Sequence, residues 1–459
     1  MVLDPKTPGV YIQEVSIFPP SITSVATAIP AFIGYTEIQP SPNVPVRISS
    51  MNDYVANFGG AHRYVNINIT NAAPNGGYVP TFHANNFFLY YALQMYFANG
   101  GGPCYVISVG DYDATPAATD FANISWKDGA FAKLILEDEP TLIVMPELKL
   151  FASGAAYTVY QHALRQCNEL QDRFVIIDVI DEPGSATDMT PITNLHSGIG
   201  NQYLKYGAAY YPDLKTTLTY PPEAVLFAGG ALAGKTMAYA LSTTVLLEAD
   251  QWVSREKDVR AALAKLSITL PPSSTIAGVY ASVDRSRGVW KAPANVSVTA
   301  VVKPVITITN DIQNDLNVPA NGKAVNAIRS FTGKGVLVWG ARTLAGNDNE
   351  WRYVPVRRLF IMVEESIRKA TEWVVFEPND ANLWLKVKTM IENYLLNLWK
   401  DGALAGAVSK DAFFVKVGLN QTMTAQDILE GKLIVEIGMA AVRPAEFVIL
   451  KFSHKLQVS

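Results

Sequence analysis

Cysteine and charged residues are scarce in this chain, and their scarcity narrows the kind of protein it can be. The two cysteines, Cys104 and Cys167, lie in apolar surroundings without C-x-x-C spacing, which excludes a disulfide framework and is typical of a reducing compartment. Charged residues make up 17% of the chain, below the usual roughly 25%. No basic stripe indicates nucleic-acid binding, and neither a run of about 18 apolar residues nor a secretion signal is present. We therefore expect no nucleic acid and no membrane insertion.

Side chains that could catalyse a reaction or bind a metal occur, but not in the required patterns. A segment starting at Asp111 begins like a calcium loop, yet it has Pro116 where glycine is needed and Ala122 where the closing glutamate belongs. No G-x-S-x-G or cysteine-protease pattern is present. We therefore predict no catalytic, cofactor-binding or metal residues, and a protein that is not an enzyme. The histidines, none of them in H-E-x-x-H spacing, are His62, His83, His162, His196 and His454.

A glycine-rich segment in the middle of the chain resembles a phosphate-binding loop. Residues 229–236 read GGALAGKT and fit G-x-x-x-x-G-K-[ST], in which backbone N–H groups cradle phosphates. Residues 224–227 could form the strand before it, residues 237–247 the helix after it, and Asp178 the acidic residue that nucleotide chemistry needs. Glycine runs before helices also arise by chance. A P-loop nucleotide-binding protein is therefore kept as an alternative.

The chain is rich in apolar residues and alternates between two kinds of periodicity. With 459 residues, 49% apolar and 10% aromatic, it is long enough for about two to four domains. Short apolar strands alternate with helices, a pattern typical of a mostly parallel sheet. Residues 216–266 interrupt this pattern and are expected to be helical, partly as an insertion. The predicted fold is α/β (α+β), with mixed sheets and flanking helices in a multidomain chain. Strands are predicted at 31–35, 104–109, 142–146, 173–178 and 206–212, and helices at 52–58, 87–99 and 157–168.

The region from residue 331 to residue 455 predicts a compact α+β domain. After an apolar strand at 335–344, a first helix shows apolar residues at helical spacing and ends before Pro378. Asn379 or Asp380 can cap a second helix, whose last turn contains Lys400. The remaining predicted elements are a strand at 413–418, a short helix at 424–430, and strands at 432–437 and 446–455.

Each end of the chain carries a lone apolar strand next to prolines. Prolines flank residues 10–15 on both sides, and Pro444 precedes residues 447–452, so neither strand has a hairpin partner beside it. We expect both strands to pair with the C-terminal domains of neighbouring subunits, with linkers at 19–20 and 443–444. For the first strand, an edge position in the chain's own sheet is the alternative. The arm residues are Val10, Tyr11, Ile12, Glu14, Val15, Phe447, Val448, Ile449, Leu450 and Phe452.

Several segments, taken in order, resemble the contractile tail sheath proteins. This family includes the sheaths of phage tails, of R-type bacteriocins and of phage-tail-like injection systems. The resemblance is nearly continuous over the last 125 or so residues, in segments 351–360, 364–367, 373–380, 398–404 and 443–448. Further similar segments are residues 8–14, the glycine-ended helix before Cys104, and residues 276–281 and 287–295.

The resemblance implies a structural subunit of a contractile sheath. Such a subunit polymerises as stacked rings of six around an inner tube and contracts to drive the tube through a target envelope. Its partners are copies of itself, the inner tube protein, and baseplate and terminal cap proteins, and it needs no cofactor. It assembles in the bacterial cytoplasm and acts in a phage tail or phage-tail-like particle, outside the cell after lysis. A static tube or capsid-like protein is the alternative.

The resemblance also implies a division of the chain and a surface that faces the tube. The expected parts are an N-terminal arm (1–28), the first part of the α/β core (29–110), a middle or outer region (111–330), the inner C-terminal domain (331–443) and a C-terminal arm (444–459). Charged residues on the C-terminal helices are candidates for contact with the tube, although a solvated helix face would look the same. The candidates are Lys386, Lys388 and Lys400, with Arg357, Arg358, Arg368 and Lys369 as rivals.

Overall fold

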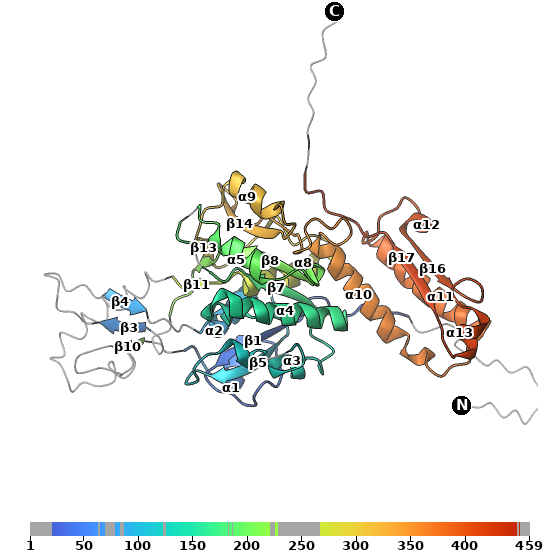
Figure 1. Ribbon diagram of the computed structural model, residues 1–459, viewed down its shortest axis with the longest axis horizontal. Helices are drawn as coiled ribbons and strands as arrows, with labels where there is room; N and C mark the ends of the chain where they lie inside the picture. Colours follow the sequence, from blue (N-terminus) through green and yellow to red (C-terminus); the bar gives the residue numbers. More distant parts are fainter. Residues whose placement is uncertain are drawn as a thin grey trace, which may run out of the picture. The chain divides into compact units, whose positions relative to one another are not determined.

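The computed structural model of the chain describes residues 21–62, 65–68, 79–82, 87–122, 125–181, 183–185, 187–220, 225–227, 267–447 and 449. Its contacts divide the chain into two compact units. The larger unit comprises Ala26–Ile361 and Arg443–Ser459, and the smaller unit comprises Met1–Val25 and Met362–Val442. Figure 1 labels the helices and strands. No helix within the described ranges is long and apolar enough to cross a membrane.

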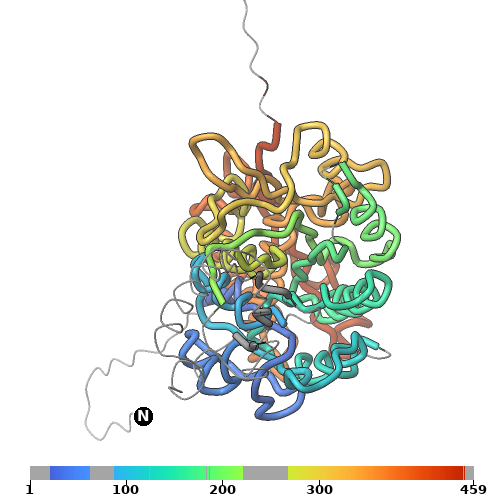
Figure 2. Tube along the Cα trace, turned by 90° about the vertical axis from the view of Figure 1, so that its left-hand side faces the viewer, coloured from blue at the N-terminus to red at the C-terminus, as the bar shows by residue number. Residues whose placement is uncertain are grey.

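A nine-stranded sheet forms the centre of the larger unit. Its strands are β1 (Pro30–Thr36), β2 (Val46–Ile48), β5 (Cys104–Asp111), β6 (Leu142–Val144), β7 (Phe174–Asp178), β8 (Gly207–Tyr211), β12 (Val296–Ser297), β14 (Val325–Phe331) and β15 (Gly335–Val338). They follow the order β12-β15-β14-β8-β7-β6-β1-β5-β2. The strands from β14 to β5 are parallel, and antiparallel partners extend both ends of the row. Figure 2 shows this order as a change of colour from blue at the bottom to yellow and orange at the top.

Helices cover the central strands of this sheet. They are α1 (Met51–Phe58), α2 (Leu89–Ala98), α3 (Gly129–Leu134), α4 (Ser153–Leu170), α5 (Thr190–Gly198), α8 (Ser273–Arg287) and α9 (Asn310–Asn317). Every residue of β1, β6, β7 and β8 is buried, as expected of parallel strands covered on both faces. α2 and α8 pack together, with α2 on β1 and α8 on β6 and β7, whereas α4 packs on β7 and α5. Gly278 permits the close α2–α8 contact, because a Cβ there would lie 2.5 Å from the Tyr96 carbonyl oxygen.

Two small sheets contain strands from within or next to the region that the sequence marks as an insertion. One contains β3 (Val65–Asn68), β4 (Val79–Phe82) and β10 (Val225–Phe227), and the other contains β9 (Leu214–Thr216), β11 (Thr269–Leu270) and β13 (Val301–Pro304). The helical expectation for residues 216–266 is wrong at 225–227, which form strand β10 and pair with β3. Residues 221–224 and 228–266, including the GGALAGKT motif, lie outside the described residues. The larger unit also contains the short 3-10 helices η1 (Ala118–Asp120), η2 (Pro146–Leu150) and η3 (Leu204–Tyr206).

The smaller unit combines helices with a two-stranded sheet. α10 (Val354–Ala370) begins in the larger unit and ends in the smaller one, followed by η6 (Glu372–Val374), α11 (Ala381–Lys400), α12 (Ser409–Ala412), β16 (Phe413–Val417), α13 (Ala425–Leu429) and β17 (Val435–Met439). The side chain of Asp380 caps α11 by accepting the Leu383 N–H at 2.8 Å, which confirms the predicted cap. Val387, Ile391, Leu395 and Leu398 form its buried face.

The predicted fold class is confirmed, since the larger unit combines mixed sheets with flanking helices and the smaller unit combines helices with an antiparallel strand pair. The contacts, however, divide the chain at Met362 rather than at the expected residue 331. The reason is that β14 and β15 extend the central sheet of the larger unit: β14 pairs with β8, and β15 pairs with β14. An apolar strand between glycines does not reveal which sheet it joins.

Candidate functional site

The C-terminal segment is held to the larger unit at Glu446. Arg342 donates from Nε to Glu446 Oε1 at 2.9 Å and from Nη2 to Oε2 at 2.6 Å. The Tyr353 hydroxyl donates to Oε2 at 3.0 Å, and the Asn317 amide donates to Oε1 at 2.8 Å. Burial would raise the pKa of Glu446, but the hydrogen bonds from Arg342, Asn317 and Tyr353 outweigh it and hold the pKa below its usual value. We call these four residues the C-terminal clamp.

The chain beyond the clamp exposes apolar side chains. Phe447 is 69% exposed and Ile449 is 79% exposed. Residues two apart share one face of an extended chain, so these two would form one apolar row in a strand. The described residues Glu446, Phe447 and Ile449 are not in a strand, and Val448, Leu450 and Phe452 lie outside the described residues. The C-terminal arm strand therefore stays a prediction.

Part-buried polar contacts also hold residues 24–27, near the end of the predicted N-terminal arm (1–28). In the smaller unit, the backbone N–H of Val25 donates to Ser366 Oγ at 3.0 Å, and Ser24 Oγ lies 3.0 Å from the Tyr394 hydroxyl. In the larger unit, Arg358 Nη2 donates to the carbonyl oxygen of Thr27 at 2.8 Å and lies 2.5 Å from Asp284 Oδ2. The predicted arm residues lie outside the described residues; they are Val10, Tyr11, Ile12, Glu14 and Val15.

The small sheet of the smaller unit offers a place where strands could add. β16 and β17 are antiparallel and form a sheet of two strands within the described part of the chain, so each strand has one edge without a strand partner. β16 packs on α11 through its buried Val415 and Val417. On the opposite face, Phe414 lies over Gly438, where a Cβ would be 2.2 Å from its ring. A two-stranded sheet is marginal alone, and added strands would extend it.

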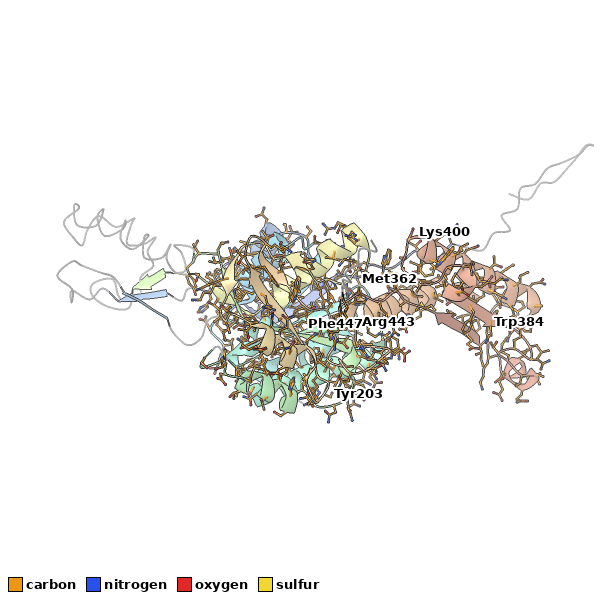
Figure 3. All side chains as sticks on the ribbon, turned by 90° about the horizontal axis from the view of Figure 1, so that it is seen from above. Tyr203, Met362, Trp384, Lys400, Arg443 and Phe447 are labelled. Carbon is orange, nitrogen blue, oxygen red and sulfur yellow. The ribbon has the colours of Figure 1, made fainter. Side chains whose placement is uncertain are left out.

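The lysines proposed to meet the tube lie on α11. Lys386 and Lys400 are exposed, and Lys388 pairs with Glu392 at 3.8 Å on the same helix. Figure 3 shows Trp384 and Lys400 toward opposite ends of α11. The helix thus presents separated positive charges along its length. Nothing in the chain alone shows what they contact, so the tube surface stays a prediction.

The rival basic residues are engaged within the chain. Arg357 is 2% exposed and its guanidinium lies over the rings of Trp351 and Tyr206, at 4.5 and 5.0 Å. Arg358 is 3% exposed and pairs with Asp284. On the smaller unit, Glu365 pairs with Arg368 at 2.6 Å and with Lys369 at 3.3 Å. Burial removes Arg357 and Arg358 from the subunit surface, so they are poor candidates for contacting a tube.

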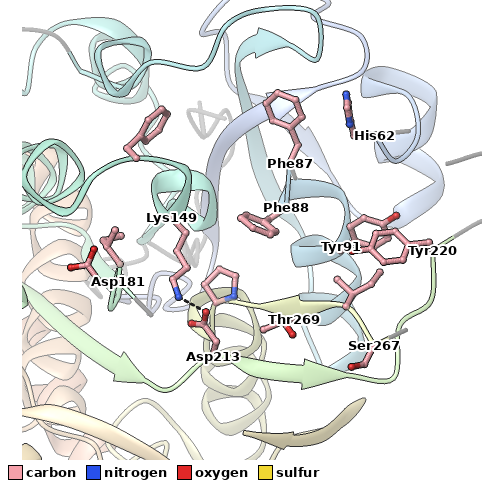
Figure 4. A pocket seen from close by; sticks show the side chains of 14 residues that line it. His62, Phe87, Phe88, Tyr91, Lys149, Asp181, Asp213, Tyr220, Ser267 and Thr269 are labelled. Carbon is pink, nitrogen blue, oxygen red and sulfur yellow. Dashed lines mark hydrogen bonds and ion pairs between the residues drawn. The ribbon is translucent and has the colours of Figure 1, made fainter. Parts of the chain in front are cut away.

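A cavity of about 510 Å³ opens in the larger unit (Figure 4). Lys149 and Asp213 line it and form an ion pair in which the side chains are 8% and 10% exposed. Burial lowers the pKa of His62, at the edge of the cavity, to about 3, so this imidazole is neutral near pH 7. Within the described residues no group of three or more His, Cys, Asp or Glu side chains could hold a metal. The lining thus contains an ion pair in which the charges of Lys149 and Asp213 neutralise each other.

Asp178 is the acidic residue that a nucleotide-binding function would need, and it is hydrogen-bonded to Ser273 within the fold. Asp178 is fully buried and accepts hydrogen bonds from the Ser273 backbone N–H at 2.8 Å and from the Ser273 hydroxyl at 2.5 Å. Burial raises its pKa to about 7, although both hydrogen bonds oppose this effect. Asp178 therefore joins β7 to the start of α8. The loop motif at 229–236 lies outside the described residues, so its geometry gives no support to the alternative.

Sequence reasoning missed the partners of Glu446. Glu446 was expected in the terminal strand, and Arg342 at the exit of strand 335–344, but nothing in the sequence connects them. Arg342 and Glu446 are 104 residues apart, and Asn317 and Glu446 are 129 apart. The sequence did contain one indication of such partners. Glu446 is an acidic residue in an otherwise apolar predicted strand, and a buried acidic residue requires a hydrogen-bonding or charged partner.

Three comparisons relate the chain to known proteins. Residues 346–455 match the phage tail sheath C-terminal domain. The tail sheath protein of Burkholderia phage BcepMu is 32% identical over 141 residues, which cover 30% of this chain and 29% of that protein. That match therefore spans less than two thirds of the relative's own length.

The structural matches extend over nearly the whole chain. A chain of the anti-feeding prophage (AFP) baseplate shares 32% identity with a TM-score of 0.66, over 98% of this chain and 100% of that one. A chain of the PVC sheath complex, an extracellular contractile injection system in its contracted state, shares 31% identity with a TM-score of 0.67, over 99% of each chain. These full-length matches and the matched C-terminal domain agree with the resemblance found in the sequence. The chain belongs to the contractile tail sheath protein family.

Proposed function

We propose that this chain polymerises around an inner tube as the subunit of a contractile sheath, and that contraction drives the tube through a target envelope. The observation that carries the proposal is the full-length similarity to a chain from a contracted sheath complex, at 31% identity. Subunits with the same fold would pack in a long and a short lattice, and contraction would be a transition between these packings. The chain would thus act as a structural protein and not as an enzyme.

Strand exchange between subunits would hold such a sheath together. Each chain has two terminal arms with apolar strands in their sequences, and the described β16–β17 sheet has two edges without a strand partner. Two arms and two edges match in number, so every edge could receive one strand from a neighbour. A main-chain hydrogen bond contributes only about 0.5–1.5 kcal/mol net, so a single added strand is a modest link. Repeated in every subunit, these links would form a continuous mesh.

The partners follow from this role. The chain would contact copies of itself in stacked rings of six, an inner tube, and baseplate and terminal cap proteins, without nucleic acid or membrane insertion. The positive charges of Lys386, Lys388 and Lys400 on α11 would face an acidic tube surface. Assembly in the bacterial cytoplasm would precede action in a phage tail or phage-tail-like particle, outside the cell after lysis.

Truncation tests the strand exchange directly. One chain would lack residues 1–20, and another would lack residues 447–459 but keep Glu446 and its clamp. We expect both to remain folded subunits, as judged by circular dichroism and thermal unfolding, and to form no long sheaths when produced with the tube protein. Long, ordered sheaths from either truncated chain would show that its missing strand does not link subunits.

A further inference from the structure

We infer that Arg342 is the positioning residue of the C-terminal arm. It fixes Glu446 in the larger unit, so that the link to a neighbouring subunit begins at Phe447. This inference rests on the proposed function, because the exit point of the arm matters only if the arm pairs with another subunit. It also changes the expected location of the hinge, which the prolines had placed at residues 443–444.

The guanidinium of Arg342 joins the arm to the subunit's own backbone. Its side chain is 4% exposed, and that of Glu446 is 20% exposed. While Nε and Nη2 donate to the carboxylate, Nη1 donates to the carbonyl oxygens of Asn317 at 3.1 Å and Gly346 at 3.4 Å. A planar guanidinium with several bonds on both sides has little freedom to rotate. The carboxylate is therefore held at a fixed position.

The arginine is in turn fastened to the central sheet. Asn326, which lies on β14 and is 1% exposed, accepts the Arg342 N–H at 2.7 Å and donates to the Arg342 carbonyl oxygen at 2.8 Å. The same amide donates to the carbonyl oxygen of Ala209 on β8 at 3.0 Å. Bonds thus run from β8 through Asn326 and Arg342 to Glu446. Tension on the arm would pass into the most deeply buried strands of the subunit.

The contacts change abruptly after Glu446. Phe447 and Ile449 expose most of their apolar side chains, whereas Glu446 is held by four hydrogen-bonding side-chain groups of the clamp. Residues 443–445 connect the last residue of the smaller unit, Val442, to the clamp. Flexibility at Arg443 and Pro444 would therefore act between the two units of one chain. The part of the arm that a neighbouring subunit could bind therefore begins beyond the clamp.

Spin labelling can test this assignment on the full-length soluble subunit. Cys104 and Cys167 are buried, so a cysteine introduced at Ala445 or at Ile449, both exposed, can be labelled selectively. Each label is placed in the otherwise unchanged chain, in Glu446→Gln, and in Asp213→Asn. The last variant is the matched control, because Asp213 belongs to a buried ion pair of the same unit that does not involve the arm.

We expect the label at 445 to be restrained and the label at 449 to be mobile in the unchanged subunit. Glu446→Gln should make the spectrum at 445 resemble the one at 449, whereas Asp213→Asn should leave it restrained. With the tube protein present, Glu446→Gln should give few or irregular sheaths, and Asp213→Asn normal ones. If Glu446→Gln does not fold, Tyr353→Phe removes a single clamp bond and should loosen the 445 label partly.

Two results would overturn the inference. One is a 445 label that is equally mobile with and without Glu446. The other is a Glu446→Gln chain with a loosened 445 label that still assembles and contracts like the parent, since the clamp would then not position the arm. If even the parent forms no sheath with its tube, the proposed function fails, while the spin-label spectra still decide whether the clamp holds residue 445.

Discussion

Arg342 Nη2 lies 2.6 Å from Glu446 Oε2, although the two residues are 104 positions apart in the chain. This pair connects the last described segment to the central sheet through a nearly buried guanidinium. Removing one partner of a largely buried, hydrogen-bonded ion pair leaves the charge of the other partner without an opposite charge nearby. The pair is therefore the most sensitive point at which the terminal arm can be disturbed without altering the apolar core.

The stability contributed by the clamp should depend on pH. Because the pKa of Glu446 is lower in the folded chain than its usual value, the folded state favours the carboxylate. The stabilisation by Glu446 is present above the pKa that this residue has in the unfolded chain. It is lost as the pH falls through the pKa that the residue has in the folded chain. At pH 7, Glu446→Gln should reduce the free energy of unfolding by about 1–3 kcal/mol, measured by urea unfolding. The difference from the parent should shrink below about pH 4.5, and a difference independent of pH would contradict this account.

Glu147 should contribute clearly to the stability of the larger unit. This fully buried carboxyl group accepts backbone N–H groups of Phe88 at 2.9 Å and Leu89 at 3.0 Å, at the start of α2, and that of Tyr35 on β1. Glutamine offers a single acceptor oxygen and would leave a buried N–H unsatisfied, at about 1–3 kcal/mol per group. We expect Glu147→Gln to lower the unfolding midpoint in urea clearly. The control is Glu350→Gln, exposed on the same unit, which should change stability by no more than about 0.5 kcal/mol.

The lysines of α11 should matter for tube binding and not for folding. Reversing the exposed charges, in Lys386→Glu with Lys400→Glu, should leave thermal unfolding nearly unchanged, because surface substitutions usually alter stability by less than about 0.5 kcal/mol. It should reduce the fraction of tubes enclosed by sheath in electron micrographs. Lys410→Glu, also exposed on the smaller unit, is the control and should assemble normally. Equal assembly by all variants would remove these lysines from the tube contact.

Nucleotide should have no part in assembly or contraction. We expect Lys235→Ala sheaths to form and contract like the parent, and isothermal titration of the subunit with ATP at millimolar concentration to show no saturable heat. Saturable ATP binding that disappears in Lys235→Ala would contradict this and favour the phosphate-loop alternative.

The sequence predicted local structure well and long-range pairing poorly, for physical reasons. Asp380 at the N-terminus of α11 and Lys400 in its last turn belong to one helix, so cap chemistry and the helix dipole suffice to predict them. The strand at 335–338 was also expected, but its membership in the nine-stranded sheet depends on pairing with β14, which a lone apolar run does not specify. The clamp was missed because Glu446 is satisfied by side chains from three distant segments. The predicted arm strands would need a neighbouring subunit, which a single chain does not contain.

The central claim is that this chain builds a sheath with two packings around a tube. The most direct measurement is electron microscopy of the chain produced together with its tube and baseplate proteins, imaged before and after a contraction trigger such as acid or mild denaturant. The account predicts two kinds of sheath, one long and narrow around the tube and one shorter and wider, with the same subunit in both. Filaments of one diameter under all conditions would contradict it and indicate a static tube.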